Sequence, residues 1–228
     1  MAAGLKQYDI DPPALDPNGI AESQSVTADN LALNGALCDS GTALQFDIGD
    51  SYGADIAGVK LLFDAGSDIS TAVFTITGKD EYGNAVTEAV TGVTTTAVST
   101  VGYFSQVTVI AVTVAAATGC FVGTVGGAMV SKTYVLNRYS QSPAAVAVTG
   151  LTGTIDWSIQ ESFDNIAIDG GSSAAWLAPV NSTGAGLTTT ATDLAGTLDQ
   201  NATGARLIVN SYSDGAELQF HVSDSPFR

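Results

Sequence analysis

The stretch that decides the fold class is Ile155-Asp156-Trp157-Ser158-Ile159-Gln160, in which large apolar residues alternate strictly with polar ones. Successive side chains of a β-strand point to opposite faces, so this period of two predicts a strand with one buried face and one solvated face. The stretch Glu217-Leu218-Gln219-Phe220-His221-Val222 alternates in the same way. An amphipathic helix would instead place its apolar residues three and four positions apart.

Similar segments lie on both sides of these two strands. Runs rich in Val, Thr, Ile and aromatic residues occur at 59–63, 73–77, 107–114 and 206–212. These residue types favour the pleated, half-buried surface of a sheet. Turn-forming clusters such as Tyr82-Gly83-Asn84 and Ser213-Asp214-Gly215 separate the runs, and no segment of helical length has an apolar stripe. The sequence therefore predicts an all-β chain.

The chain also resembles itself. A shift of 98 residues places 107–124 on 205–222, and a shift of 83 places 74–76 on 157–159. The difference leaves 15 extra residues in the second copy, around 170–190. Paired strands in the same order and phase predict two tandem β-sandwich domains, of jelly-roll or immunoglobulin-like type, related by a pseudo-duplication.

The domain boundaries follow from composition. We expect an extended N-terminal arm over residues 1–30, a first β-sandwich over 31–130 and a second over 131–228. The arm contains Asp11-Pro12-Pro13, which favours an extended backbone, and Asp16-Pro17-Asn18-Gly19, which favours a β-turn. It has no periodic apolar face, so we expect it to become ordered against a partner.

Charge excludes several classes of function. Seven Lys and Arg residues oppose 23 Asp and Glu residues, which gives a formal net charge of -16. Phosphate backbones would repel such a protein, so we expect no nucleic-acid binding. No uninterrupted apolar run reaches the roughly 18 residues of a membrane span. The N-terminus lacks an apolar signal core, and we expect the protein to be made in the cytoplasm.

Residues for catalysis are scarce in the sequence. His221 is the single histidine, and it lies on the polar side of an alternating strand. Neither a nucleophile elbow nor a glycine-rich phosphate loop is present. The sequence predicts a protein that is not an enzyme and that has no cofactor. Cys38 and Cys120 could form one disulfide or remain free thiols, and the spacing alone leaves both options open.

Calcium is the metal to consider, because oxygen ligands cluster at two places. One cluster lies within residues 9–18, and the other consists of Asp80, Glu81 and Asn84. Neither cluster follows the alternating ligand register of an EF-hand loop. We expect these acids to cap turns; if calcium does bind, Asp80, Glu81 and Asn84 are the candidate ligands.

Three segments support a family resemblance. The stretch from Ile76 to Gly92, ITGKDEYGNAVTEAVTG, resembles a recurrent stretch in structural proteins of tailed-bacteriophage virions. There a strand ends in a T-G-x-D-x-x-G-N turn and a T-E-x-V-x-G strand follows. The segments 8–21 and 205–215 are similar to the start and the final hairpin of such proteins. The resemblance implies a capsid-associated protein, such as a decoration or cement protein, and it transfers no catalytic residues.

The expected function is therefore structural. We expect a virion protein on the outer surface of the capsid, bound to the major capsid protein and to copies of itself as a dimer or trimer. Its negative charge would keep free copies apart and soluble. The candidate partner-binding residues are Tyr8, Asp9, Ile10, Asp11 and Leu15 in the arm, and Trp176 in the extra loop of the second domain.

The sequence also suggests a second function, in which aromatic residues would bind a ligand. A host-recognition or carbohydrate-binding module, such as a fibre or a minor tail or vertex component, would present Trp176 and Tyr103 on an exposed face. Aromatic rings at such places bind sugars or neighbouring subunits through their flat apolar faces.

Overall fold

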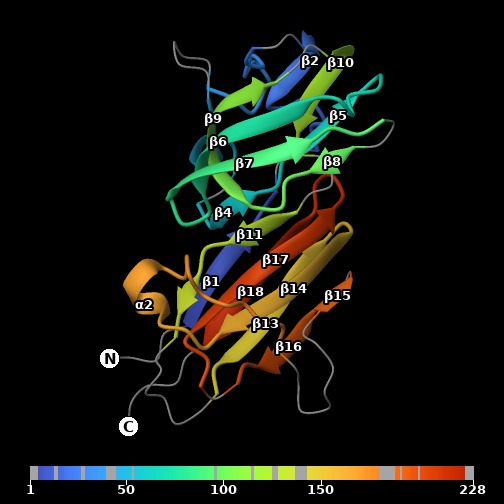
Figure 1. Ribbon diagram of the computed structural model, residues 1–228. Coiled ribbons are helices and arrows are strands. Elements are labelled where there is room, and N and C mark those ends of the chain that lie inside the picture. The colour runs from blue at the N-terminus through green and yellow to red at the C-terminus, as the bar shows by residue number, and fades with distance from the viewer. Residues whose placement is uncertain are drawn as a thin grey trace. The chain divides into compact units, whose positions relative to one another are not determined.

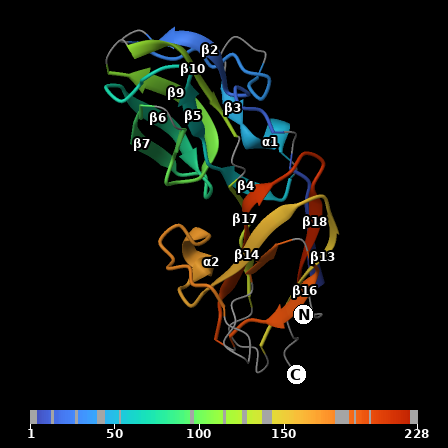
Figure 2. The same ribbon diagram turned by 90° about the vertical axis from the view of Figure 1, so that its right-hand side faces the viewer.

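The computed structural model of the chain describes residues 5–12, 15–26, 29–39, 45–52, 54–94, 97–113, 116–124, 128–136, 143–179, 188–190, 192–199 and 201–223. Strands dominate these ranges, which otherwise contain two single-turn helices, α1 (Ile48–Ser51) and α2 (Ile166–Asp169) (Figures 1 and 2). The expected all-β class is thereby confirmed. The chain divides into two compact units: unit 1 comprises residues 1–14 and 130–228, and unit 2 comprises residues 15–129.

Unit 2 is a β-sandwich. Its strands are β2 (Ala21–Val26), β3 (Phe46–Asp47), β4 (Ile56–Val59), β5 (Leu62–Ala65), β6 (Val73–Asp80), β7 (Ala85–Thr91), β8 (Val98–Ser99), β9 (Phe104–Val112) and β10 (Ala116–Gly123). One sheet has the order β2-β10-β5-β8, and the other has the order β4-β9-β6-β7 with β3 paired to β9. The rings of Phe63 on β5 and Phe74 on β6 lie 5.0 Å apart, centroid to centroid. The two sheets therefore pack face to face.

Unit 1 contains an equivalent set of strands. They are β1 (Leu5–Ile10), β11 (Met129–Ser131), β12 (Tyr134–Val135), β13 (Ala145–Thr152), β14 (Ile155–Ser162), β15 (Thr188–Thr190), β16 (Leu194–Thr197), β17 (Gly204–Tyr212) and β18 (Glu217–Ser223). One sheet has the order β1-β18-β13-β16. The other strands have the order β15-β14-β17-β11, and β12 pairs with β17.

The two units share one topology. In unit 2 the last strand, β10, lies between the first strand, β2, and β5. In unit 1 the last strand, β18, lies in the same way between the first strand, β1, and β13. This is the strand order of a jelly roll. The register agrees at one end of the ladder. Gly78 and Lys79 pair with Val107 and Gln106, and shifts of 83 and 98 residues convert these pairs into the observed pairing of 161–162 with 205–204. Nearer the start of β6 the converted register is one residue off: Ile76 pairs with Ile110, but the structure pairs 159 with 207 and not with 208.

The N-terminal segment differs from the expected arm. Residues 5–10 are strand β1 of unit 1, whereas residues 21–26 are strand β2 of unit 2, so 1–30 is not a separate element. The reason lies in β1, where Tyr8 and Ile10 are each 1% exposed and alternate with exposed residues. Unit 2 is consequently inserted in the sequence of unit 1, between its first strand and the rest. The two units are interleaved along the chain rather than strictly tandem.

The extra residues of the second copy lie in one connection. In unit 2, β6 and β7 are joined by the four-residue turn 81–84, whereas in unit 1 the equivalent strands β14 and β15 are joined by residues 163–187. The described part of this connection, residues 163–179, contains α2 and is called the unit 1 loop below.

Candidate interaction surface

Strand β1 is an edge strand of unit 1. It pairs antiparallel with β18 along its whole length, from Leu5 opposite Ser223 to Ile10 opposite Leu218. Its inward side chains close the sandwich: the ring of Tyr8 stacks on that of Phe220 at 6.0 Å, and the ammonium group of Lys6 lies 4.9 Å from the centre of the Tyr8 ring. The segment predicted as an extended arm ordered against a partner is thus an integral strand of unit 1.

The structure separates the candidate arm residues into two groups. Tyr8 and Ile10 point into the core of unit 1 and are not available at its outer surface. Asp9 and Asp11 are exposed, and Leu15 is half-buried in unit 2. Of the five predicted partner-binding residues, only Asp9 and Asp11 lie together on an exposed face of the same unit.

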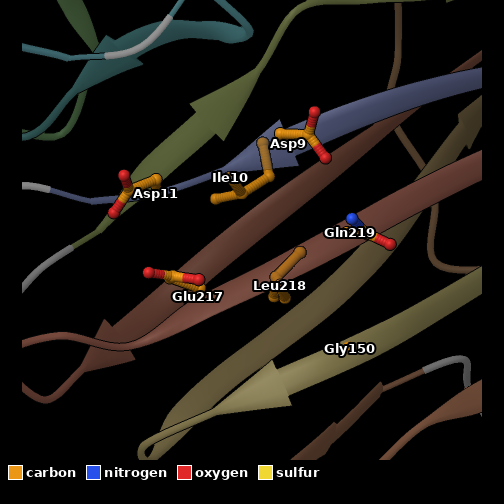
Figure 3. Close-up of a pocket in the computed structure, with 7 residues that line it drawn as sticks. All are labelled: Asp9, Ile10, Asp11, Gly150, Glu217, Leu218 and Gln219. Atoms are coloured by element: carbon orange, nitrogen blue, oxygen red, sulfur yellow. The ribbon is translucent and has the colours of Figure 1, made fainter.

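A pocket of about 310 Å³ opens where β1, β18 and β13 meet, lined by Asp9, Ile10, Asp11, Gly150, Glu217, Leu218 and Gln219 (Figure 3). Asp9 lies opposite Gln219 and Ile10 opposite Leu218 across the β1–β18 ladder. Gly150 has a φ of 66°, which suits glycine, and it lies in the irregular part of the β13–β18 pairing. The rim includes three carboxylates and no basic residue, so the pocket is acidic.

Trp176 packs against an arginine instead of standing free. Its ring lies over the guanidinium group of Arg206 on β17, 4.2 Å from ring centroid to Cζ. Arg206 is 7% exposed and its Nε donates to Oε1 of Gln160, its pairing partner on β14, at 2.8 Å. The half-buried Trp176 thereby covers a cation on the outer face of the β14–β17 pair.

Short side chains hold the unit 1 loop in shape. Asp164 accepts a hydrogen bond from the backbone N–H of Ala175 at 2.6 Å, and Asp169 accepts one from Gly171 at 2.9 Å. The side chain of Ser173 donates to Asp169, and this hydrogen bond, with the Gly171 N–H, lowers the pKa of Asp169 below its usual 3.8.

The loop also combines one buried anchor with an exposed apolar surface. Ile166 of α2 is buried against Gly204, where a Cβ would lie 2.8 Å from Cγ1 of Ile166. Phe163, Ile168 and Leu177 are 43%, 80% and 52% exposed. No apolar surface of this kind exists at the equivalent turn of unit 2, which is polar.

Glu161 is the buried acid of unit 1. It follows Ile155, Trp157 and Ile159 in the inward-facing positions of β14 and is 6% exposed. Burial raises the pKa of its carboxyl group above 4.5, the hydrogen bond from the Asp199 N–H at 2.8 Å lowers it, and the charge of Asp199 raises it again. Its backbone exchanges two hydrogen bonds with Leu177, which joins the strand to the end of the loop.

The Asp80 turn of unit 2 is built by its own hydrogen bonds. Oδ1 of Asp80 accepts from the N–H groups of Tyr82 at 2.9 Å and Asn84 at 2.8 Å, and Gly83 has a φ of 84°. The carboxylate therefore caps the β6–β7 hairpin. Within the described ranges, no group of three or more His, Cys, Asp and Glu residues is placed to hold a metal ion.

The structure also describes the two cysteines, the histidine and the tyrosine that the sequence analysis named. Cys38 and Cys120 both lie in unit 2 and are free thiols; burial is the main reason that the pKa of each is raised to about 11. His221 lies half-buried on β18, and its Nε2 is 2.9 Å from Oγ1 of Thr149. Tyr103 is half-buried in unit 2, and the ammonium group of Lys60 lies 5.1 Å from the centre of its ring.

Sequence reasoning missed two of these features. The role of β1 was hidden because only two apolar residues, Tyr8 and Ile10, alternate there between acidic and proline-rich neighbours. Glu161 could have been found, since it continues the alternation of Ile155, Trp157 and Ile159 into an inward position. A carboxyl group at a core position of a strand is itself a signal of an altered pKa.

In the part of the chain that the structure describes, no helix is long and apolar enough to cross a membrane. Comparisons with protein-family models, curated proteins and solved structures found no match for this chain.

Proposed function

We propose that this chain is a non-enzymatic structural protein of a bacteriophage virion, which decorates and stabilises the capsid from its outer surface. The observation that supports this most directly is the repeated topology: each unit has the jelly-roll strand order, an architecture used by viral capsid proteins. The resemblance of residues 76–92 to virion proteins points the same way. Because one fold serves many functions, the sequence resemblance and the charge must support the inference as well.

The surface chemistry fits attachment to a particle. A net charge of -16 keeps free copies apart in solution and disfavours contact with packaged DNA. A capsid-binding face would then combine acidic and apolar groups, so that it matches a basic surface with an apolar pocket. The unit 1 loop offers this combination, because Ile168 and Leu177 are exposed beside Asp164 and Asp169.

The test is to locate the protein in particles. Virions from the source of this sequence are purified, and the chain is quantified by mass spectrometry against the major capsid protein. We expect a fixed ratio of this chain to the major capsid protein, as for a binding site that the capsid symmetry repeats over the whole shell. We also expect density for the chain on the outer surface in a cryo-electron-microscopy map. Absence from the particles, or density lining the interior, would contradict the proposal.

Copy number also separates the proposal from its alternative. The jelly roll occurs in lectins too, and Trp176 is held in a fixed orientation by Arg206, as an aromatic platform for a sugar would be. A copy number limited to a tail or vertex, together with binding to host polysaccharide that Trp176→Ala abolishes, would favour a host-recognition module. Binding that persists in Trp176→Ala would remove this loop from consideration.

A further inference from the structure

The first strand of unit 1 is separated in the sequence from the rest of that unit. Strand β1 pairs with β18, more than 200 residues later, and residues 15–129 between them fold into unit 2. In unit 2 the equivalent strand β2 belongs to the same continuous segment as its partner β10. We propose that β1 is exchanged between copies, so that β1 of one molecule completes unit 1 of a second molecule and the second completes the first.

The first argument is that β1 can leave without disturbing other pairs. It lies at the edge of its sheet, and β18 is its only neighbour among the strands that the structure describes. Every other strand of that sheet keeps its ladder when β1 departs, because β18 also pairs with β13. Exchange of an identical element between two copies is a low-cost route to a dimer.

The second argument is that unit 1 needs a strand in this place. Without β1, the buried rings and apolar side chains at Phe220 and Leu218 would lose the cover that Tyr8 and Ile10 provide. The backbone edge of β18 would also lose its hydrogen-bonding partner along six residues, from Leu218 to Ser223. Such an open edge accepts a matching strand from another chain, as in donor-strand complementation.

The third argument concerns the connection. Only residues 11–14 separate β1 from unit 2, and the sequence there is Asp11-Pro12-Pro13-Ala14. Both Asp11 and Pro12 precede a proline, which disfavours the helical backbone region for each of them. Short hinges between exchanged elements promote exchange.

The extent of strand exchange depends on protein concentration and on salt. Each β1 makes the same contacts in either molecule, so these contact energies cancel between the two arrangements. What remains is the entropy lost on association, the strain of the connector, and repulsion between two chains of charge -16. Exchange should therefore increase with protein concentration and with salt, which screens the repulsion.

Disulfide trapping tests the proposal on the purified full-length protein. Asp9 and Gln219 are Cα partners on β1 and β18, neither of them is buried, and such partners in antiparallel strands have a separation that a disulfide can span. The variant Asp9→Cys/Gln219→Cys is made in a Cys38→Ser, Cys120→Ala background, refolded under oxidising conditions and separated on non-reducing gels. Exchange predicts that covalent dimers become the main species as concentration rises. Internally bridged monomers at every concentration would overturn it.

The matched control places the same bridge inside unit 2. Thr77 and Val109 are Cα partners on β6 and β9, which both lie in the continuous segment of that unit. Thr77→Cys/Val109→Cys in the same background must give bridged monomers under the same conditions. Dimers of the control variant in equal amount would show that the cross-links are unspecific, and this would equally overturn the proposal.

A mixing experiment removes the dependence on the double variant. Asp9→Cys and Gln219→Cys are prepared separately, so each protein carries one new thiol, and are refolded together. Exchange predicts disulfide-linked dimers that contain one copy of each, identified by mass. Dimers of identical copies alone would refute it. Because neither experiment uses virions, the exchange can fail while the proposed virion role stands, and the reverse also holds.

Discussion

The ring of Tyr8 stacks on the ring of Phe220, with centroids 6.0 Å apart and planes inclined by 21°. This contact joins the beginning of the chain to its end, and both rings are inaccessible to solvent. The N-terminal strand is therefore part of a hydrophobic core, and its removal should act on stability before it acts on any partner.

Removal of the Tyr8 ring tests whether β1 stabilises unit 1. Tyr8→Ala should destabilise unit 1 by about 3 kcal/mol, the usual cost of removing a buried aromatic ring. Both tryptophans, Trp157 and Trp176, belong to unit 1, so tryptophan fluorescence in urea reports its unfolding. Gln7→Ala, at the exposed neighbouring position, should stay within about 0.5 kcal/mol of the unchanged protein. Equal transitions for both variants would contradict the buried role of β1.

The stacked pair Trp176–Arg206 gives a second prediction. Arg206→Met keeps much of the volume but removes the cation under the ring and the hydrogen bond to Gln160. We expect a loss of about 1 to 2 kcal/mol, from the cation–π contact and one charged hydrogen bond. The fluorescence of the native protein should shift to the red as Trp176 becomes more mobile and wetter. An unchanged spectrum would show that Arg206 does not hold the ring.

Glu161 predicts a dependence on pH. Its folded-state pKa is raised above 4.5 by burial, so its ionisation opposes folding. The stability that the neutral form contributes is complete below the unfolded-state pKa and is lost as pH rises through the folded-state value. Glu161→Gln keeps the neutral form and an acceptor for the Asp199 N–H. The variant should be more stable than the unchanged protein at pH 7 and lose this advantage near pH 4.5. A constant difference across this range would contradict the assignment.

The two thiols give a prediction for unit 2. Because burial raises the pKa of Cys38 and Cys120 to about 11, only about a thousandth of each is thiolate at pH 8. A thiol reagent should react slowly with the native protein and quickly with two thiols in denaturant. Detection of no thiol in denaturant, without a reductant, would instead demonstrate a disulfide between them.

The parts of the fold that sequence reasoning found are those with a strict local period. The alternation in 155–160 and 217–222 predicted β14 and β18 and their buried faces. The internal shifts of 83 and 98 residues reappear in the pairing of 161–162 with 205–204, and the rest of the β14–β17 ladder differs from them by one residue. These signals are local, because a strand with one buried face records its environment in every second residue.

The parts that were missed depend on partners far along the chain. Nothing within 5–10 indicates that the partner strand is 217–223, and the proline-rich sequence after β1 favoured the interpretation as an extended arm. The same holds for the loop, where the lack of alternation around Trp176 was visible but its contact with Arg206, 30 residues later, was not. Such pairings are decided by the packing of the whole unit.

The insertion of unit 2 within unit 1 has a consequence for synthesis. The ribosome makes β1 first and β18 last, so all of unit 2 can fold while β1 has no partner. Unit 1 has very long-range contacts and can be completed only after β18 has left the ribosome, which predicts a slow late folding step. Until then Tyr8 and Ile10 remain uncovered. On a polysome, where neighbouring chains are close together, this delay is the period in which the first strand of one chain can meet the last strand of another.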